Sequence, residues 1–408
     1  MMQPKFTVII PTRERSDVLK ASLKTVLAQS YEQLEIIVSD NFSCDDTESV
    51  VASFADDRIR YINTGKRVSM SHNWEFALSH VSEGWITIIG DDDGLLPGCL
   101  NKISELIRLT DAQAIRSVTC FYTWPDLVGT NFGRLCVPLT SGWEKRSCKE
   151  WLAKVMMGKR SYIELPMLYN GGFVDFEILK QLKEITGKFY CSMTPDVYMG
   201  IAIASIIPSY IYFFEPVAIN GASRHSGGTS AFSKKKKSAN SPSEKFFREP
   251  NIPFHNALPL DKHKRPIVSI QAIVYEAYLQ SKCLRQSSEF EDHEIQLVLI
   301  LACAGKHKES VTEWGQVFAD KHGLDMEKAS SKAKYIELRF KIFNWKNRII
   351  DVFFNRRLIG GDITCSLKDV YEASIAAGTI YSISPNKIDN LLGFVATRLG
   401  AKKIMRKP

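Results

Sequence analysis

The stretch Trp85-Ile86-Thr87-Ile88-Ile89-Gly90-Asp91-Asp92-Asp93-Gly94-Leu95-Leu96-Pro97, WITIIGDDDGLLP, runs an apolar segment directly into three adjacent carboxylates. The apolar part, rich in β-branched residues, is typical of a buried strand. Neighbouring carboxylates repel one another, and a divalent cation relieves that repulsion. Mg²⁺ and Mn²⁺ prefer one or two carboxylates together with substrate phosphate oxygens. The stretch therefore indicates a strand end that binds a cation and a diphosphate; a solvated acidic turn is the alternative interpretation.

Around this stretch, the first 100 residues alternate between strand and helix patterns. Strands are expected at Phe6–Ile10, Leu34–Ser39, Ile59–Ile62 and Trp85–Ile89, and helices from a capping Ser16, over 45–55 and over Asn73–His80. Strands that alternate with helices pair in parallel through right-handed crossovers. In such sheets the loops beyond the carboxyl ends of the strands form the ligand crevice. Three polar loops, PTRER, DNFSCDD and GDDDGLLP, are therefore expected to meet at one edge.

The rest of the chain divides into a less regular middle, a polar break and a helical end. Helices are expected over Asn101–Leu109 and Asp196–Ile207, and a strand over Tyr210–Ala218. Gly227–Phe247 is rich in Ser, Gly and Lys, which is typical of a loop or linker. The expected division is 1–230 for the α/β domain, 231–262 for a flexible basic linker and 263–408 for a mostly helical C-terminal domain.

Composition excludes several classes of protein. The chain of 408 residues is 45% hydrophobic and 24% charged, which is typical of a globular protein with more than one core. No apolar run reaches the length of a membrane span, and the N-terminus does not read as a signal peptide. The nine cysteines form no CxxC pair, which indicates a reducing compartment and argues against zinc and disulfide frameworks. We expect a cytoplasmic protein.

The pattern TVIIPTRER…DNFSCDD…WITIIGDDDGLLP resembles the family 2 glycosyltransferases, which have the GT-A fold. The resemblance is closest over residues 5–100, extends to about 230 and is absent beyond. It implies a Rossmann-like α/β domain, a nucleotide-diphosphate sugar donor, and Mn²⁺ or Mg²⁺ as cofactor. The acceptor would be a hydroxyl of a glycan or of a lipid-linked glycan, in the synthesis of surface polysaccharide or lipopolysaccharide.

The resemblance also assigns residues to the nucleotide sugar. They are Pro11, Thr12, Arg13, Asp40, Asn41, Arg67, Asn73, Asp91, Asp92 and Gly171. Asp40 would accept hydrogen bonds from the base. Arg67 carries a guanidinium group, which pairs with phosphate in bidentate fashion, although an exposed surface charge is the alternative. Gly171, in YNGGF, would let the backbone approach donor or acceptor, and an ordinary hairpin turn is equally compatible with that segment.

The acidic cluster departs from the commonest family pattern, D-x-D-D, because Gly90 stands at its first acidic position. The metal ligands are therefore expected from the three following residues, with Asp93 and either Asp91 or Asp92 facing the metal and the ribose. His225, in GASRHSGGTS, follows a predicted strand, and enzymes with this fold often supply a histidine from that region as a further ligand. A structural histidine is the alternative.

Asp196 is the candidate general base. Sugar transfer to a hydroxyl needs a group that removes the proton as oxygen attacks the anomeric carbon, and a single displacement inverts that carbon. In the family this base lies at a helix start, usually in a Glu-Asp pair, and here the sequence is Pro195-Asp196. Asp196 is also the only acidic residue between Glu184 and Glu215. The alternative is that Asp196 only caps its helix.

The second part of the chain is strongly basic. Residues 335–360, YIELRFKIFNWKNRIIDVFFNRRLIG, read as a basic amphipathic helix that can lie on an anionic membrane, helped by Lys234–Lys237. The alternative is a helical subdomain that buries Ile336, Phe340, Phe343 and Ile350. No nucleic-acid-binding module is recognisable. The rival functions are a metal-dependent nucleotidyltransferase and a non-catalytic protein that binds lipid or a partner through its basic part.

Overall fold

The computed structural model describes residues 3–125, 134–227, 230, 241–285, 287–353, 357–359 and 367–383, with the side chains of 342–359 left out. The strands are β1 (Phe6–Thr12), β2 (Leu34–Asp40), β3 (Ile59–Asn63), β4 (Trp85–Ile88), β5 (Gly94–Leu95), β6 (Ala114–Thr123), β7 (Leu135–Pro138), β8 (Trp143–Ser147), β9 (Gly172–Asp175), β10 (Ser209–Ala222) and β11 (Arg357–Ile359).

The helices are α1 (Ser16–Leu27), α2 (Thr47–Ala52), α3 (Met70–Leu78), α4 (Cys99–Thr110), α5 (Cys148–Met156), α6 (Phe176–Thr186), α7 (Pro195–Ile206), α9 (Pro242–Phe247), α10 (Ile270–Gln280), α11 (His293–Ala302), α12 (Lys308–His322), α13 (Met326–Phe353) and α14 (Val370–Ile383). A short 3₁₀ turn, η1, spans Tyr162–Glu164.

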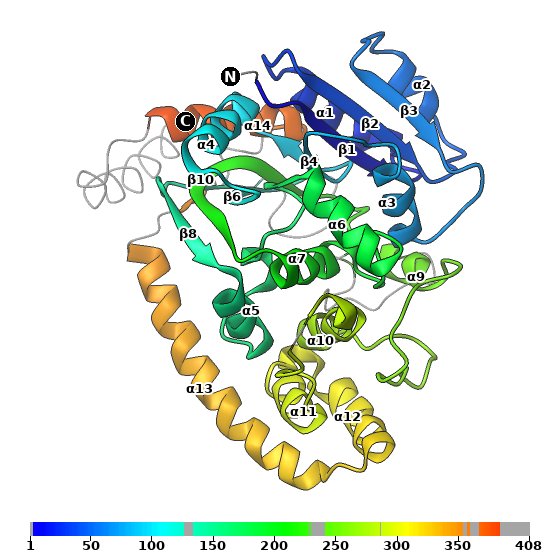
Figure 1. Ribbon diagram of the computed structural model, residues 1–408, viewed down its shortest axis with the longest axis vertical. Helices are drawn as coiled ribbons and strands as arrows, with labels where there is room; N and C mark the ends of the chain where they lie inside the picture. The colour runs from blue at the N-terminus through cyan, green and yellow to red at the C-terminus, as the bar shows by residue number, and fades with distance from the viewer. Residues whose placement is uncertain are drawn as a thin grey trace, which may run out of the picture.

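The sheet has the strand order β11-β7-β6-β9-β4-β1-β2-β3, and β10 lies beside β6 (Figure 1). Strand β1 is parallel to β2 and β4, and β2 is parallel to β3, so the predicted parallel half is confirmed. The register places Thr12 beside Asp40, which brings the ends of β1 and β2 to the same edge. Strand β9 pairs antiparallel with both β4 and β6, so the sheet as a whole is mixed.

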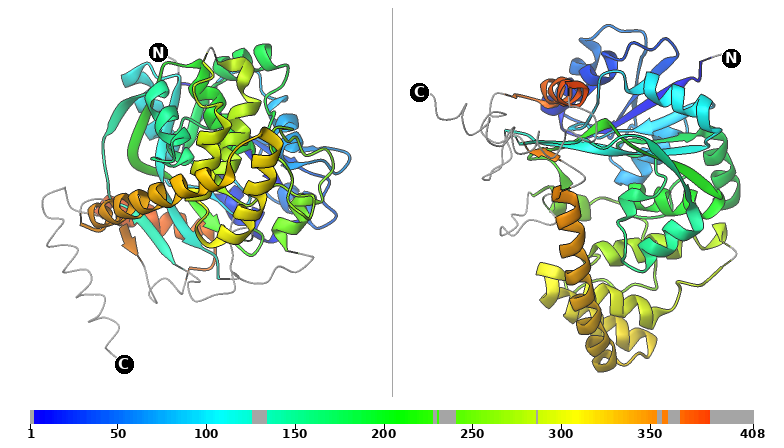
Figure 2. Two further views of the ribbon diagram at one scale, coloured as in Figure 1. Left: turned by 90° about the horizontal axis from the view of Figure 1, so that it is seen from below. Right: turned by 90° about the vertical axis from the view of Figure 1, so that its left-hand side faces the viewer.

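Helices cover both faces of this sheet, and the alternation of side chains along β1 explains why (Figure 2). Phe6, Val8 and Ile10 enter one apolar cluster with residues of α1 and α4. Ile9 points to the other face, into a cluster with residues of α3 and α7. Strands that are apolar on both faces are typical of parallel sheets buried between helices.

Two local predictions at the start of the chain differ from the structure. The first strand, expected over Phe6–Ile10, continues through Pro11 to Thr12. Pairing of β1 with β4 ends at Ile9, so the missing N–H of Pro11 removes no bond on that side. Ser16 is the first residue of α1 and provides no side-chain cap; its own N–H donates to Asp45 Oδ2 at 2.9 Å.

The C-terminal helices share a core with the α/β part. Val197 and Ile201 of α7 belong to the same buried cluster as Val274 of α10, Leu297 of α11 and Trp314 of α12. Helix α14 returns to the other side of the sheet and packs against α1 (Figure 2). The mostly helical C-terminal region is confirmed, while the division at 231–262 stays a prediction.

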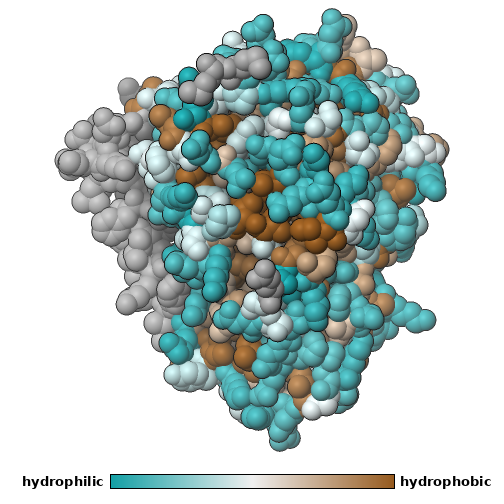
Figure 3. Space-filling view, in the orientation of Figure 1, coloured by the Kyte–Doolittle hydropathy of each residue, from teal (hydrophilic) through white to brown (hydrophobic). Residues whose placement is uncertain are grey.

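Helix α13 runs along one side of the molecule from α12 toward the sheet (Figure 1). Ile336 and Phe340 are partly buried and pack against the core, as the helical-subdomain interpretation expects. Phe343, Ile350 and Lys234–Lys237 lie outside the described side chains. None of the helices within the described ranges combines the length and apolar character that crossing a bilayer requires. The face in Figure 3 is largely hydrophilic, with apolar side chains gathered near its middle.

Candidate active site

A cavity of about 480 Å³ opens where β1, β2 and β4 end. Eight of the residues predicted for the site line it: Pro11, Thr12, Arg13, Asn41, Asn73, Asp91, Asp92 and Asp196. The other predicted residues, Asp40, Arg67, Asp93, Gly171 and His225, lie outside its lining. The strand ends thus converge as the sequence predicts, since residues more than 150 positions apart share one cavity.

Asp91 is held by the loop that follows β1. Thr12 Oγ1 donates to its Oδ2 at 2.9 Å, and Arg15 Nη1 forms an ion pair with its Oδ1 at 2.8 Å. Arg15 also donates through Nη2 to the carbonyl of His225 at 2.7 Å. Burial raises the pKa of Asp91, and the Arg15 charge opposes that rise. The guanidinium therefore neutralises the first carboxylate and ties it to the segment after β10.

Asp92 is held by that same segment. Its Oδ2 accepts hydrogen bonds from the hydroxyls of Ser223 and Ser226, both at 2.6 Å. Its backbone carbonyl accepts from Trp124 Nε1 at 3.0 Å. The carboxylate lines the cavity while its hydrogen bonds fall on one oxygen. Of the three carboxylates, Asp92 is consequently the one best placed to present an oxygen to a bound cation.

Asp93 points into the protein. Its Oδ2 accepts from Tyr169 Oη at 2.6 Å and from the Gly90 N–H at 2.9 Å, and its Oδ1 accepts from the Gly221 N–H at 2.7 Å. Burial, followed by the neighbouring Asp92 charge, raises the pKa of Asp93 to about 7. A side chain with both oxygens engaged and none of its surface exposed supports the strand end rather than the cavity.

His225 does not join the acidic cluster. Its Nε2 contacts Asp17 Oδ2 at 2.9 Å, and only its backbone carbonyl is linked, through Arg15, to Asp91. The predicted ligand set of Asp91, Asp93 and His225 is therefore not brought together, because the segment after β10 binds the cluster through its serines and its backbone. Within the described residues, no three His, Cys, Asp or Glu side chains are grouped so as to hold a metal ion.

Asp40 is engaged at the end of β2. Its Oδ1 accepts from Ser43 Oγ at 2.6 Å, and its Oδ2 accepts from Tyr61 Oη at 2.6 Å and Asn63 Nδ2 at 3.1 Å. Burial, followed by the hydrogen bond to Asp40, raises the pKa of Tyr61 to about 12. In this conformation Asp40 shapes the loop and faces no ligand space. Its predicted contact with a nucleobase needs a change of partners.

Of three other residues predicted to contact the nucleotide sugar, two line the cavity and one lies on the surface. Asn41 and Val68 exchange two hydrogen bonds, at 2.8 and 2.9 Å, and Asn73 accepts from Ser39 Oγ at 2.8 Å. Both asparagines line the cavity. Arg67 instead pairs with Glu14 at 2.6 Å on the surface, as its alternative interpretation expected.

The YNGGF segment contributes through its tyrosine. Gly171 has φ of 89°, and a Cβ there would lie 2.7 Å from Ser117 Oγ, so the turn requires glycine. Tyr169, two residues earlier, lines the cavity and donates to Asp93. Its ring lies 5.5 Å from that of Trp74, which lines the same cavity. The contribution of Gly171 to the site is thus indirect, since this glycine shapes the loop that places Tyr169.

Asp196 stands at the start of α7 and lines the cavity. Tyr162 Oη donates to its Oδ2 at 3.3 Å. Burial raises the pKa of Asp196, and hydrogen bonds from the Val197 N–H and from Tyr162 oppose the rise. Thr194 precedes the helix but makes no side-chain cap. A carboxylate with a raised pKa in a cavity has the chemistry of a general base.

Sequence reasoning missed the cavity residues that come from α9 and the segment that follows it. Glu249, with a side chain only 5% exposed, pairs with Arg13 at 2.6 Å and accepts from the Met70 N–H at 2.8 Å. Phe246 and Phe247 of α9 also line the cavity. The segment was read as a linker because its Ser and Lys content is high, and no local pattern signals a contact nearly 240 residues away.

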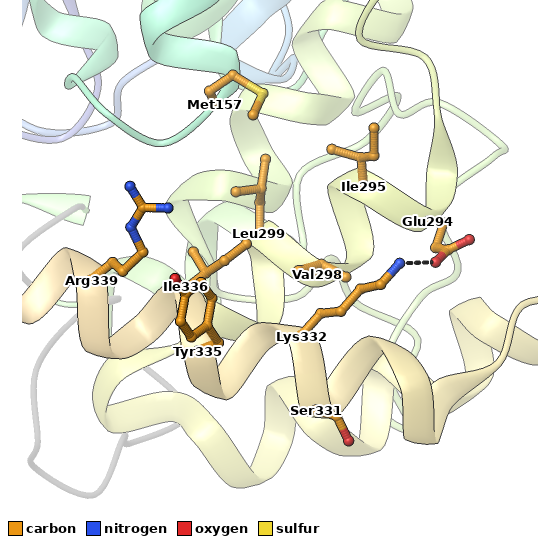
Figure 4. A pocket seen from close by; sticks show the side chains of 10 residues that line it. All are labelled: Met157, Glu294, Ile295, Val298, Leu299, Ser331, Lys332, Tyr335, Ile336 and Arg339. Carbon is orange, nitrogen blue, oxygen red and sulfur yellow. Dashed lines mark hydrogen bonds and ion pairs between the residues drawn. The ribbon is translucent and has the colours of Figure 1, made fainter.

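A second cavity, of about 590 Å³, lies between α11 and α13 (Figure 4). Its lining is mainly apolar, with Val298, Leu299 and Ile336 among its residues. The Lys332–Glu294 ion pair, at 2.7 Å, crosses its edge. No strand residue is among the described residues that line this cavity, and its Glu294 and Lys332 are paired with each other. The strand-end cavity is therefore the candidate active site.

The comparisons with known proteins agree with this choice. The sequence model of the family described as glycosyl transferase family 2 matches residues 7–124, the part that supplies β1 to β4 and the acidic cluster. The predicted resemblance is confirmed over these residues. The α/β sheet with a helical C-terminal region is the architecture expected of the GT-A fold.

Curated relatives match between a fifth and a quarter of the chain. A GalNAc(5)-diNAcBac-PP-undecaprenol β-1,3-glucosyltransferase of Campylobacter jejuni is 39% identical over 105 residues, 25% of this chain and 34% of that protein. A UDP-Glc:α-D-GlcNAc-diphosphoundecaprenol β-1,3-glucosyltransferase of Escherichia coli is 29% identical over 87 residues, 21% of this chain and 34% of that protein. The chain thus spans about a third of the length of these relatives.

Among solved structures, S. aureus TarS 1–349 in complex with UDP-GlcNAc aligns with 82% of this chain and 92% of its own. The TM-score is 0.45 and the sequence identity is 11%.

Proposed function

We propose that this protein is an inverting glycosyltransferase that moves a sugar from a nucleotide-diphosphate donor to a hydroxyl of a glycan or lipid-linked acceptor, in the synthesis of surface polysaccharide or lipopolysaccharide. The observation that carries the proposal is that one cavity is lined by two carboxylates suited to different roles, one for a cation and one for a proton. Asp92 lies at the end of β4, and Asp196 lies at the start of α7. The family 2 domain and the lipid-linked substrates named for two relatives support it.

Each part of the cavity has a place in this reaction. Thr12, Asn41 and Asn73 offer hydroxyl and amide groups for the nucleoside, and Arg13 offers a guanidinium group to the diphosphate. Asp196 would accept the proton of the attacking hydroxyl. Its raised pKa makes it a stronger base than an exposed aspartate.

A divalent cation, Mn²⁺ or Mg²⁺, belongs to the proposal. Asp92 would hold it, because this carboxylate lines the cavity with one oxygen less engaged than the other. One carboxylate together with phosphate oxygens and water is a donor set that both ions accept. When bound, the ion would neutralise charge on the departing diphosphate.

Two measurements test the proposal. Thermal unfolding with Mn²⁺ and a panel of UDP- and GDP-sugars should show stabilisation by at least one donor, since a ligand that binds only the folded state raises the melting temperature. With that donor, slow release of the nucleoside diphosphate is expected. Asp196→Asn should keep the thermal shift and lose at least about a hundredfold in turnover. Release of pyrophosphate, or normal turnover by Asp196→Asn, would contradict the mechanism.

Peripheral contact with the inner face of the membrane also stays a proposal. Helix α13 exposes Tyr335 and Leu338, by 64% and 58%, beside the cations Lys334 and Arg339. Apolar and cationic groups on one helix favour an anionic lipid surface. Cosedimentation with phosphatidylglycerol vesicles but not with phosphatidylcholine vesicles is the expected result, and equal pelleting with both would contradict it.

A further inference from the structure

Arg116 of β6 is a buried cation whose partners are backbone carbonyls. The residue is 5% exposed. Its Nε donates to the carbonyl of Ile163 at 2.6 Å, and its Nη1 donates to the carbonyls of Tyr169 and Asn170 at 2.9 and 2.7 Å. In the described part of the chain these bonds reach no carboxylate. A buried charge without a paired opposite charge is costly, so its retention points to a role beyond stability.

The carbonyls that Arg116 binds belong to two loops of the candidate active site. Ile163 follows Tyr162, whose hydroxyl donates to Asp196 Oδ2 at 3.3 Å. Tyr169 donates its own hydroxyl to Asp93 Oδ2 at 2.6 Å. One planar guanidinium thus fixes the backbone beside both tyrosines. The candidate base and the acidic cluster are each oriented by a tyrosine, and both tyrosines depend on the same arginine.

Arg116 also acts on Asp196 by its charge. Burial raises the pKa of Asp196, and the Arg116 charge is among the influences that lower it. The other titratable groups that act on this carboxylate are the hydroxyls of Tyr162, Tyr169 and Tyr190, all with pKa values raised well above the ordinary value. The charged groups that share the cavity are Arg13, Arg15, Asp91, Asp92 and Glu249.

We propose that Arg116 is a positioning residue for sugar transfer: its guanidinium fixes the two loops that aim Tyr162 at Asp196 and Tyr169 at Asp93, and its charge favours the ionised form of Asp196. The proposal rests on the proposed function, in which Asp196 is the base. Arg116 itself touches no reacting atom, since it lies outside the lining of the cavity.

Two substitutions separate the charge from the hydrogen bonds. Arg116→Lys keeps a positive charge near Asp196 but loses the fork that reaches Ile163 and Asn170 together. Arg116→Gln loses the charge but keeps a hydrogen-bond donor, the amide group, on a shorter side chain. If both effects operate, the lysine variant is slow with a nearly normal pH dependence. The glutamine variant is slow, and as pH falls it loses activity at a higher pH than the wild type does.

The experiment follows UDP release from UDP-glucose with Mn²⁺ between pH 5 and 9. For Arg116→Gln, the acid limb of kcat should move up by about one pH unit, because the neutral form of Asp196 is then favoured. For Arg116→Lys, the limb should stay within about 0.3 unit while kcat falls about tenfold or more from misplaced loops. Tyr162→Phe should also raise the limb, since it removes a donor to the ionised carboxylate.

Arg146 is the matched control. It is another buried arginine, but it pairs with Glu144 and Glu164 and stacks on Trp151. Arg146→Lys should lower the melting temperature without moving the acid limb. Near-UV circular dichroism confirms that each variant is folded; if Arg116→Gln is not, the Lys and Phe variants carry the test.

The proposal is overturned if folded Arg116→Gln keeps the wild-type acid limb and kcat, or if Arg146→Lys moves the limb as far as the Arg116 variants do. The outcome is distinct from a failure of the proposed function. That failure appears as an absence of UDP release by the wild type with every donor, or as normal turnover by Asp196→Asn.

Discussion

Replacing Glu276 with glutamine is expected to stabilise the protein above pH 7 and to leave its stability near pH 4.5 unchanged. Glu276 of α10 is fully buried. Its Oε1 accepts from the His255 N–H at 2.9 Å and from Gln280 Nε2 at 3.0 Å, and its Oε2 accepts from the hydroxyl of Ser192. A glutamine can keep all three hydrogen bonds, because its carbonyl accepts two and its amide donates to the serine oxygen.

The magnitude follows from the buried charge. Burial raises the pKa of Glu276 from 4.5 to about 7. The folded protein therefore holds a proton that the unfolded chain has already released, and the free energy of unfolding falls as pH rises from 4.5 to 7. At about 1.4 kcal/mol for each pKa unit, the full cost of the ionised group above pH 7 is about 3 kcal/mol. Glu276→Gln removes that cost at pH 8 and has nothing to remove at pH 4.5.

Urea unfolding followed by tryptophan fluorescence at pH 4.5 and pH 8 measures the difference. Glu276→Leu is the control, because it removes the charge and also leaves Ser192 and His255 without an acceptor. Each unsatisfied buried group costs about 1–3 kcal/mol, so this variant should be less stable than the wild type at pH 4.5, whereas at pH 8 the relieved cost of the charge offsets much of that loss. A glutamine variant that is less stable at pH 8, or equally shifted at both pH values, would refute the reasoning.

Two further substitutions probe the cavity. Gly221→Ala places a Cβ 1.8 Å from the carbonyl oxygen of Asp92. The free energy of unfolding should therefore fall by about 2–4 kcal/mol, and the Mn²⁺-dependent stabilisation by UDP should be lost. Gly200→Ala is the control, because the nearest atom that its Cβ would meet beyond its own helix lies 3.4 Å away, and it should change neither quantity. Glu249→Gln removes the internal carboxylate that pairs with Arg13, so calorimetric titration should show UDP binding several times more tightly; weaker binding would mean that the carboxylate holds the arginine ready for the ligand.

The parallel half of the sheet was predictable because its information is local. An apolar β-branched run such as Phe6–Ile10 and a helix that begins at Ser16 can each be read within a dozen residues. The rules for parallel sheets then place the ends of β1, β2 and β4 at one edge, which the register confirms.

What the sequence did not reveal depends on contacts between distant segments. The three carboxylates were placed in the site, but their directions are set by Arg15, by Ser223 and by Tyr169, up to 131 residues away. Arg116 lies in the less regular middle of the chain and belongs to no motif that sequence analysis singles out. Pairing partners of this kind follow from the antiparallel strands β9 and β10, whose positions no local pattern specifies.

The arrangement of these contacts answers the question that the acidic stretch raises. Three adjacent carboxylates need not compete for one cation, because the turn after β4 sends them to different partners. Asp91 turns to the guanidinium of Arg15, Asp92 to two serine hydroxyls, and Asp93 to Tyr169 and two backbone N–H groups. Each charge is stabilised separately, by an ion pair or by hydrogen bonds to the ionised form.

This separation has a consequence for function. The carboxylate with both oxygens bound inside the protein keeps the strand end in place, and the one beside Arg15 is already neutralised. That leaves Asp92, which faces the cavity and whose Oδ2 accepts hydrogen bonds from two serine hydroxyls and the Ser223 N–H but forms no direct ion pair. A cation that binds together with a diphosphate would then be held by one carboxylate, that of Asp92. Neutralising Asp92 should therefore weaken Mn²⁺-dependent UDP binding more than neutralising Asp91 does. Calorimetric titration of Asp92→Asn and Asp91→Asn with UDP and Mn²⁺ compares them directly, and equal losses would contradict this division of roles.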